Sequence, residues 1–445
     1  MKEIIGKYTT AKVFARTIED ECVQQIYDIC NSPGFSGTKI RIMPDTHSGT
    51  GSVIGFTSTF SDYVDPRTIG VDIGCTISAH KFSKPIKSED FVLFEHRIKE
   101  AVPMGFSIND KPVIDEKIFY KFLNTEYQKA RSMNPDMIED VGRIDEKYIM
   151  KMIQRIGMDT GIFYKSIGSV GGGNHFIEID EKCVNGEKEH YLLIHCGSRN
   201  FGVKVCNYWH KIAQNPKANK EELKAKIAEI KANCTDRKLL KDLIERAKKD
   251  AVSKNPNGFL SGDNLRGYIS DMVIAQAYAR FNHITIRDRI FEIAHKFNNI
   301  KCEESIFTTH NYIDFTTDTP IIRKGAISAK TDEIVIIPFN MAFGVAVCRG
   351  KGNEEYNCSA PHGAGRIMSR TAAKKNISMD DFKDSMKDVY STTVCSATLD
   401  ESPQAYKDPN EILELIEPTV DVLFLMKPII NIKATESEDA PWKKK

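Results

Sequence analysis

The feature that most constrains the fold of this chain is a set of six short segments, each carrying a side chain that can bind a metal or hold a proton. Five of them place that side chain among glycines, which let the backbone approach a ligand and present N–H groups to an anion. The segments are MPDTHSGTGSVIGF (43–56), IGVDIGC (69–75), SVGGGNHFIEI (169–179), IHCGSRNFG (194–202), APHGAGRIMSR (360–370) and TTHNYI (308–313), the last without the glycines. One such segment carries little information, but six in one chain predict metal ligands beside a bound phosphate.

The chain between these segments alternates between two kinds of pattern. Residues 40–80, 166–203 and 305–360 are predicted to form strands and tight loops, and helices are predicted over 115–160, 265–296, 363–390 and 409–424. The run 204–253 is dense in Lys, Glu and Ala and indicates a solvated helical excursion. Because the six segments lie on both sides of that run, we expect an α+β fold. A single compact body over 1–445 would have mixed β-sheets flanked by helices and a charged helical insertion at 204–258.

Composition narrows the class of protein. The chain has 62 Lys and Arg against 61 Asp and Glu, so it is not coated in positive charge, although a local basic groove is enough for nucleic acid. No apolar run reaches the roughly 18–20 residues of a membrane helix, and the charged first residues do not resemble a signal peptide. The 11 cysteines have no framework spacing, which favours reduced thiols or metal ligands in a cytoplasmic protein.

Five residues form a candidate metal set. Asp72 and Cys75 stand three residues apart after an apolar stretch that we expect to be a strand, and His175, His195 and His310 each stand where a strand runs out into a polar loop. A thiolate with imidazoles suits zinc, manganese or iron, and the carboxylate permits manganese. The alternative for the first pair is a helix-capping Asp beside an inert buried Cys, and a lone His is more often a core residue than a ligand.

His362 differs from the other histidines. The sequence His-Gly-Ala-Gly-Arg places an imidazole, a flexible turn and the guanidinium of Arg366 close together, and we expect a helix to follow. Backbone N–H groups at the start of that helix, together with Arg366, would hold a phosphate. The imidazole could then attack phosphorus as a nucleophile. The alternative is a helix-capping turn with an incidental histidine.

Taken together, these segments resemble the RtcB family of RNA ligases over nearly the whole chain, from Pro44 to Lys433. The family patterns are MPDxHxGxGxxIG, VGVDIGCG, GxGNHFIE, HxGSRxxG, HNY, RKGA, HGAGRxMSR and a late DESPxAYKD followed by a closing Lys. This chain has MPDTHSGTGSVIG, IGVDIGCT, GGGNHFIE, HCGSRNFG, HNY, RKGA, HGAGRIMSR and DESPQAYKD. Neither chance nor convergence explains such a series of long, uncommon motifs.

The resemblance implies a function and a set of roles. The chain would be a GTP- and manganese-dependent ligase that joins RNA 3′-phosphate or 2′,3′-cyclic phosphate ends to 5′-hydroxyl ends through a histidine–GMP intermediate on His362, in tRNA splicing or RNA repair. Cys75 would bridge two manganese ions. The metal ligands would be Asp72, Cys75, His175, His195 and His310, and the nucleotide would be held by Asn174, Phe176, Glu178, Asn340, Gly363, Ala364, Gly365, Arg366 and Lys433. The RNA backbone candidates are Arg199, Arg323, Lys324, Arg349 and Arg370, each of which could instead be a solvated surface charge.

The chain also departs from the family pattern. Thr76 replaces the Gly after the metal Cys, and Phe339 and Asn340 replace a Gly-Ser pair beside the nucleotide, which indicates a divergent branch. Two alternatives to a ligase are a metal-dependent phosphodiesterase that only opens cyclic phosphate ends, and a non-catalytic protein that binds RNA ends. A retained nucleophile at His362 argues against both. The natural RNA, the oligomeric state and a need for an activating partner of the archease kind are left open.

Overall fold

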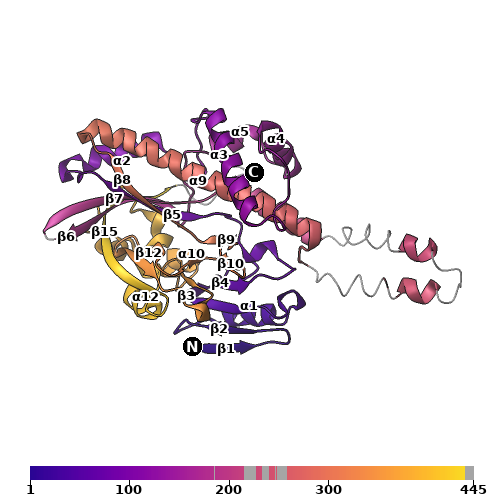
Figure 1. Ribbon diagram of the computed structural model, residues 1–445. Coiled ribbons are helices and arrows are strands. Elements are labelled where there is room, and N and C mark those ends of the chain that lie inside the picture. The colour runs from indigo at the N-terminus through magenta and orange to yellow at the C-terminus, as the bar shows by residue number, and fades with distance from the viewer. Residues whose placement is uncertain (185, 215–226, 233–239, 246, 248–257, 436–445) are drawn as a thin grey trace.

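The computed structural model of the protein describes residues 1–435 except 185, 215–226, 233–239, 246 and 248–257. Two large sheets dominate it, and a long helix runs along the second (Figure 1). The predicted α+β class, with mixed sheets flanked by helices, is confirmed. Much of the expected insertion at 204–258 lies outside the described residues, so its boundaries stay a prediction. No helix in the described ranges combines the length and the apolar run that a bilayer crossing requires.

The first sheet has six strands in the order β1-β2-β3-β4-β10-β9. They are β1 (Lys2–Ile5), β2 (Thr10–Val13), β3 (Ile40–His47), β4 (Ile54–Thr59), β10 (Ile321–Lys324) and β9 (Asn311–Asp314). Only β2 and β3 pair in parallel, and the crossover that a parallel pair needs is supplied by helix α1 (Asp20–Cys30). The buried face of α1 (Cys22, Ile26, Ile29, Cys30) packs in the same core as apolar side chains of β2 and β3. Strand β3 places Asp45 and His47 at its end, beside the functional site.

The second sheet has seven antiparallel strands in the order β12-β13-β15-β6-β7-β5-β8. They are β12 (Ile334–Asn340), β13 (Gly344–Gly350), β15 (Val420–Ile432), β6 (Phe176–Val184), β7 (Glu187–Cys196), β5 (Thr76–Phe82) and β8 (Cys302–Thr309). The sheet curls so far that its edge strands meet, and the backbone N–H of Ile336 on one edge strand donates to Oγ1 of Thr308 on the other, at 3.0 Å. Apolar side chains fill the inside of this curl, namely Ile77, Ala79, Tyr191, Leu193, Ile336, Val345, Val347 and Met426.

Helix α9 (Gly262–Asn298) joins the two halves of the molecule. Its first turns pack in one core with α1, the first sheet, α3 (Glu116–Met133) and α6 (Arg199–Ala213). Its last turns, including Ile286 and Ile290, pack with α2 (Phe91–Ala101) against the outer face of the second sheet. The remaining named helices are α4 (Glu146–Arg155), α5 (Thr160–Lys165), α10 (Arg370–Asn376), α11 (Met379–Ser385) and α12 (Pro409–Ile416). A short pair, β11 (Ala326–Ser328) and β14 (Ser359–Pro361), completes the strands.

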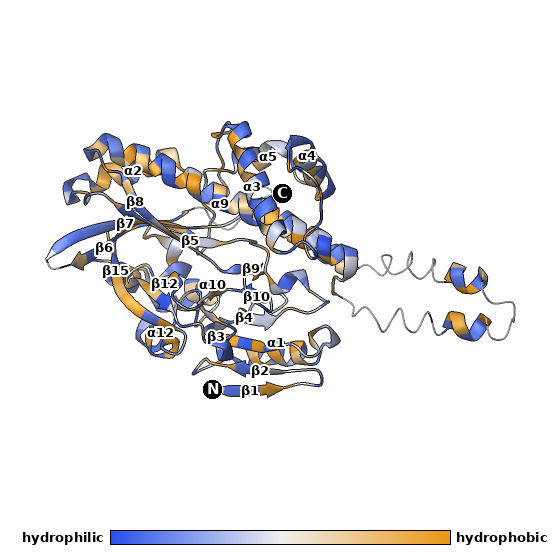
Figure 2. Ribbon diagram, viewed as in Figure 1, coloured by the Kyte–Doolittle hydropathy of each residue, from blue (hydrophilic) through white to orange (hydrophobic). Residues whose placement is uncertain are grey.

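Most predicted elements are confirmed, and two helices need correction. The helices expected within 115–160 and 265–296 are α3, α4 and α9. The helix expected from 363 begins only at Arg370. The helix expected over 409–424 ends at Ile416, and the chain continues as strand β15, an apolar ribbon in Figure 2. Pairing with β13 and β6 on both sides outweighs the apolar pattern of VDVLFLM, which fits a buried helix equally well.

Candidate functional site

The five predicted metal ligands meet at one end of four neighbouring strands of the second sheet. In the order β6-β7-β5-β8, Phe176 pairs with His195, and Thr76 pairs with both Cys196 and Thr309. This register brings four strand ends side by side. His175 directly precedes β6, His195 is near the end of β7, Cys75 directly precedes β5, and His310 directly follows β8. Asp72 and Cys75 lie in the turn that enters β5, not at the end of a strand as expected, because the glycines of IGVDIGC break the extended backbone.

The ligand atoms fall into two groups of three that share Cys75. One group is Cys75, His195 and His310, the other is Asp72, Cys75 and His175, and within each group the ligand atoms lie within 4.8 Å of one another. Sγ of Cys75 is 3.4 Å from Nε2 of both His175 and His195, and Oδ2 of Asp72 is 3.1 Å from Nε2 of His175. Cys75 is thus common to two groups of side chains, each of which could hold a metal ion.

The ionisation of these groups fits a cation. Burial, reinforced by the Asp72 carboxylate, raises the pKa of the Cys75 thiol well above its ordinary value, so the thiolate needs a metal to form. Burial and the neighbouring imidazoles lower the pKa of His195 and of His310 well below the ordinary value. Both rings are therefore neutral, with a lone pair free for a metal. The donor set of one thiol, one carboxylate and three imidazoles fits manganese or zinc.

A close backbone approach fixes Asp72. Its Oδ1 accepts from the backbone N–H of Ser198 at 3.1 Å. A Cβ on Gly197 would stand 2.2 Å from the same oxygen, so only glycine fits there. The glycine of the HCGSR segment is thus explained by the carboxylate that lies against it.

His362 stands next to the metal ligands but belongs to another element. It follows β14, and its ring centroid is 4.9 Å from that of His310. Its Nδ1 lies 2.6 Å from Oδ2 of Asp45, which is fully buried on β3. Gly365, at φ 76°, passes so close to Asp45 that a Cβ would stand 2.1 Å from its backbone oxygen. A carboxylate that accepts from Nδ1–H leaves the lone pair of the imidazole on Nε2, the nitrogen available to a substrate.

One cavity of about 500 Å³ opens beside His362. The lining includes His362 and every residue for which we expected a nucleotide contact: Asn174, Phe176, Glu178, Asn340, Gly363, Ala364, Gly365, Arg366 and Lys433. Its volume suits a nucleotide. A second cavity of about 320 Å³ is lined by the predicted metal ligands Asp72, Cys75, His175 and His310, together with Lys324 and Arg67. The two cavities share His47, Asn174 and His362, so the imidazole stands between them.

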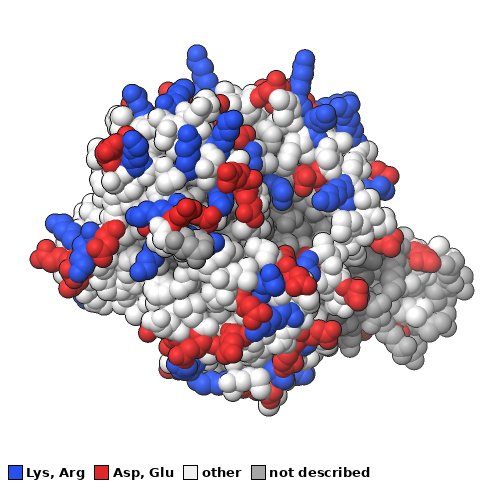
Figure 3. All heavy atoms as spheres, turned by 60° about the vertical axis from the view of Figure 1, so that its left-hand side comes forward, with Lys and Arg blue, Asp and Glu red and all other residues white. Residues whose placement is uncertain are grey.

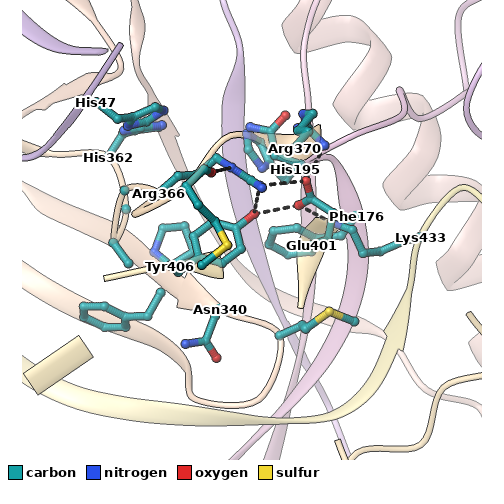
Figure 4. A pocket seen from close by; sticks show the side chains of 18 of the residues that line it. His47, Phe176, His195, Asn340, His362, Arg366, Arg370, Glu401, Tyr406 and Lys433 are labelled. Carbon is teal, nitrogen blue, oxygen red and sulfur yellow. Dashed lines mark hydrogen bonds and ion pairs between the residues drawn. The ribbon is translucent and has the colours of Figure 1, made fainter. Parts of the chain in front are cut away.

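A buried carboxylate organises the cations of the larger cavity. Figure 4 shows the side chains of Arg366, Tyr406 and Lys433 directed at Glu401. Burial opposes ionisation of Glu401, but Lys433, Arg370 and Arg366 together hold its pKa at about 2. The Arg366 guanidinium also donates to the backbone oxygens of Met368 and Asp400. The expected helix N-terminus is absent from this turn, because the helix α10 begins four residues after Arg366.

The residues that depart from the family pattern have clear local contacts. Oδ1 of Asn340 accepts from the backbone N–H groups of Ala342 and Phe343, at 3.0 and 2.9 Å. Phe339 is buried and packs its ring against Phe343. Thr76 pairs its hydroxyl with Thr309 and with the backbone oxygen of Gly74. Asn340 thus shapes the turn between β12 and β13 as well as lining the cavity.

The basic residues expected to track RNA have different environments. Arg323 is fully buried and ion-paired with Asp314 at 2.6 Å, so the prediction that it contacts RNA is wrong. Burial on a central strand, which the sequence alone does not reveal, is the reason. Lys324 donates to the backbone oxygens of Thr50 and Ser52 at the wall of the smaller cavity.

The other three basic candidates keep a route to solvent. Arg349 is exposed, and Arg199 and Arg370 are partly exposed. The face in Figure 3 carries Lys and Arg side chains with acidic side chains interspersed among them. Charge of both signs on this face fits the near-neutral total of the chain.

Sequence reasoning missed several residues of the site. Asp45, Glu401 and Tyr406 stand inside the quoted motifs MPDTH and DESPQAYKD, but no role was predicted for them. A carboxylate two residues from a histidine in a glycine-rich segment was the available signal for Asp45. No local signal marks Asn431, which hydrogen-bonds to Glu178 from a strand 253 residues away.

Two groups of metal-capable side chains that share Cys75, beside a cavity of nucleotide size and a histidine held by a carboxylate, fit the class of metal-assisted phosphoryl-transfer proteins. The chain belongs to the RtcB family: the family model described as tRNA-splicing ligase RtcB matches residues 25–434. It is 26% identical over 439 residues to the RNA-splicing ligase RtcB of Escherichia coli K12, with 94% of this chain and 95% of the relative covered. It is 24% identical over 459 residues to the tRNA-splicing ligase RtcB of Archaeoglobus fulgidus, with 90% and 88% covered. These low identities fit a divergent branch of the family.

Proposed function

We propose that this protein is an RNA ligase that joins RNA 3′-phosphate or 2′,3′-cyclic phosphate ends to 5′-hydroxyl ends, with GTP as its nucleotide and manganese as its metal. The RtcB family membership supports the RNA ligase activity. One observation carries the chemistry: His362 stands at the junction of the two cavities, with Nδ1 held by Asp45. The larger cavity would take the nucleotide and the smaller one the RNA ends.

The proposed reaction begins at Nε2 of His362. Its lone pair attacks the α-phosphorus of GTP, a P–N bond forms, and the bond to pyrophosphate breaks. Asp45 keeps the proton on Nδ1 and stabilises the positive charge that develops on the ring. An oxygen of the RNA 3′-phosphate then takes the GMP group, which breaks the P–N bond and returns the lone pair to Nε2. The 5′-hydroxyl oxygen finally attacks that 3′-phosphate and loses its proton to water, and GMP leaves with the bonding electrons.

Asp72, Cys75, His175, His195 and His310 would hold two manganese ions, with Cys75 as the bridge. When bound, paired metal ions neutralise phosphate charge and steady the entering and leaving oxygens. Lys433 and Arg370, gathered around Glu401, add positive charge to the nucleotide cavity. A cyclic phosphate end would be opened in the same site before ligation.

The organisation and setting of the protein form part of the proposal. We propose one RtcB-like body over 1–445 with a charged insertion at 204–258, acting in the cytoplasm in tRNA splicing or RNA repair. An activating partner of the archease kind is compatible with this family membership. The competing functions, a cyclic-phosphate phosphodiesterase or a non-catalytic RNA-end binding protein, would need no nucleophile at His362.

Incubation with manganese and GTP labelled at the α-phosphate tests the proposal. We expect a protein-bound guanylate that is labile in acid and stable in alkali, as a phosphoramidate is. His362→Ala should abolish the adduct while keeping the fold. His96→Ala is the matched control, because that imidazole is exposed on α2 and lines neither cavity. An unlabelled wild-type protein, or equal labelling of His362→Ala, would overturn the proposal.

A further inference from the structure

A carboxylate and a carboxamide lie side by side in the wall of the larger cavity. Glu178 on β6 and Asn431 on β15 are register partners, and each is at most 2% exposed. Nδ2 of Asn431 donates to Oε1 of Glu178 at 2.7 Å. Both residues line the cavity that we assign to the nucleotide.

The carboxamide has one atom without a partner. Oδ1 of Asn431 is buried and accepts no hydrogen bond. Among the described residues that line this cavity, no other side chain holds a buried polar atom that lacks a partner. The orientation of the amide follows from its neighbour, because the flipped amide would place oxygen against oxygen. A buried acceptor without a donor is costly, and a ligand N–H would remove that cost.

The protonation of the two acidic residues on this face of β6, Glu178 and Asp180, also bears on a ligand that donates N–H groups. Asp180 follows Glu178 on the same face of β6, is fully buried, and has no partner for either carboxyl oxygen. Burial, with the nearby Glu178, raises the pKa of Asp180 well above its ordinary value, so that carboxyl stays neutral. Burial also raises the pKa of Glu178, to about 7, against the opposing effects of Asn431 and Lys433. Above that pKa, Glu178 is a carboxylate, and the wall then offers its oxygens and the amide oxygen of Asn431 as adjacent acceptors.

We infer that Asn431 is a second base-reading residue, which accepts a hydrogen bond from the exocyclic 2-amino group of guanine while Glu178 accepts from N1–H. This inference rests on the proposed use of GTP. It assigns each donor on that edge of guanine to its own residue, and it gives Asn431 the further task of holding Glu178 in place.

Two base analogues separate the two contacts. Hypoxanthine, the base of ITP, keeps N1–H and lacks the 2-amino group, so a comparison of GTP with ITP reports on Asn431. Adenine lacks both the 2-amino group and N1–H, so a comparison of ITP with ATP reports mainly on Glu178. A site built to hydrogen-bond a group rejects the analogue that lacks it, because its own polar atom is left unpaired.

The test is equilibrium binding of GTP and ITP to the His362→Ala protein, in which no covalent adduct can form. We expect GTP to bind about tenfold or more tightly than ITP. Adding Asn431→Leu, which has a similar volume and no polar atom, should bring the ratio close to one. Asn340→Ser is the control, because it changes another amide of the same cavity and should keep the ratio. If Asn431→Leu impairs folding, the inference is still tested by two other affinity ratios of GTP to ITP. One is measured with Asn431→Ser and the other with Asn431 unchanged.

Each result decides one question. Equal binding of GTP and ITP with Asn431 in place overturns the inference, as does an unchanged ratio in a folded Asn431→Leu or Asn431→Ser protein. Labelling of the wild-type protein by GTP is measured separately. If labelling fails while the Asn431-dependent ratio holds, the proposed ligase function is wrong and the base reading stands. If labelling succeeds while GTP and ITP bind equally, the proposed ligase function stands and the base reading by Asn431 is wrong.

Discussion

Nδ1 of His362 lies 2.6 Å from Oδ2 of Asp45, and the two residues are 317 positions apart in the chain. The contact joins β3 of the first sheet to the segment after β14, so the orientation of the imidazole depends on the docking of distant elements. The Asp45 side chain is fully buried, whereas the His362 side chain is 16% exposed and lines both cavities. A buried acceptor on one ring nitrogen makes the opposite nitrogen the reactive one.

The first prediction concerns that contact. Asp45→Asn keeps the shape of the side chain but lets its amide donate to Nδ1, which would move the ring proton to Nε2. We expect guanylate formation to slow by on the order of a hundredfold or more, with metal content and fold unchanged. The rate of labelling by α-labelled GTP, with circular dichroism as the fold check, measures this. A rate within a factor of about two of wild type would remove Asp45 from the mechanism.

The second prediction concerns the metals. Cys75 belongs to both ligand groups, so Cys75→Ala should reduce bound metal at both and stop guanylate formation and ligation. Cys183→Ala, at the exposed end of β6, is the matched control and should keep full metal content. Elemental analysis of the purified proteins gives the metal count. A Cys75→Ala protein with wild-type metal content would place the metal elsewhere.

The third prediction concerns stability and pH at Glu178. Its pKa is raised to about 7 in the folded protein, by burial, against about 4.5 in the unfolded chain. The folded state therefore binds the proton more tightly, and stability falls as pH rises from 4.5 to 7. Glu178→Gln, which can still accept from Asn431, should be more stable than wild type by about 1–3 kcal/mol at pH 8. Urea unfolding at pH 8 and pH 5 checks this, since the gain should nearly vanish at pH 5. The same gain at both pH values would show that Glu178 does not titrate in this range.

The fourth prediction concerns nucleotide choice. GTP should be kept over ATP by a hundredfold or more, on the order of a few kcal/mol, because adenine leaves the buried carboxylate unpaired. Glu178→Gln should weaken that preference. Asn340→Ser should change affinity for both nucleotides and leave the preference alone, because Asn340 shapes the turn after β12. Adduct formation with each nucleotide across the three proteins provides the comparison. Equal labelling of the wild type by GTP and ATP would show that the altered turn has changed the cofactor.

The fifth prediction concerns the buried charge cluster at Glu401. Its pKa, held at about 2 by Lys433, Arg370 and Arg366 despite burial, lies below the unfolded value, so it stabilises the fold above pH 4.5. That contribution is lost as pH falls through about 2. Glu401→Gln leaves cations without their partner and should cost about 3–5 kcal/mol at neutral pH. Urea unfolding measures the loss, and Glu414→Gln, an exposed partner of Arg16, should have no measurable effect. A neutral outcome for Glu401→Gln would mean that solvent reaches the cluster.

The predicted metal ligands could be found from the sequence because each stands at a position with a local signal. His175, His195 and His310 stand where apolar strands meet polar loops, and antiparallel register does the rest. The contacts that escaped prediction join residues with no local signal in common. Asp45 and Asn431 contact residues that are hundreds of positions away in the chain. The burial of Arg323 depends on the position of β10 between β4 and β9, which the sequence around Arg323 does not indicate. The error after Ile416 has the same origin, since only pairing tells an apolar strand from a helix.

Strand β15 follows every other strand that the structure describes, yet it lies inside the second sheet, between β13 and β6. During synthesis, therefore, β6 and β13 leave the ribosome long before the strand that must separate them. Until then both carry an unpaired edge, which is a site for mispairing and for capture by chaperones. Asn431 and Lys433 come with this last strand, so the nucleotide wall cannot form on a nascent chain. We expect the protein to acquire its fold after translation, at the slow pace of sheets built from contacts distant in sequence.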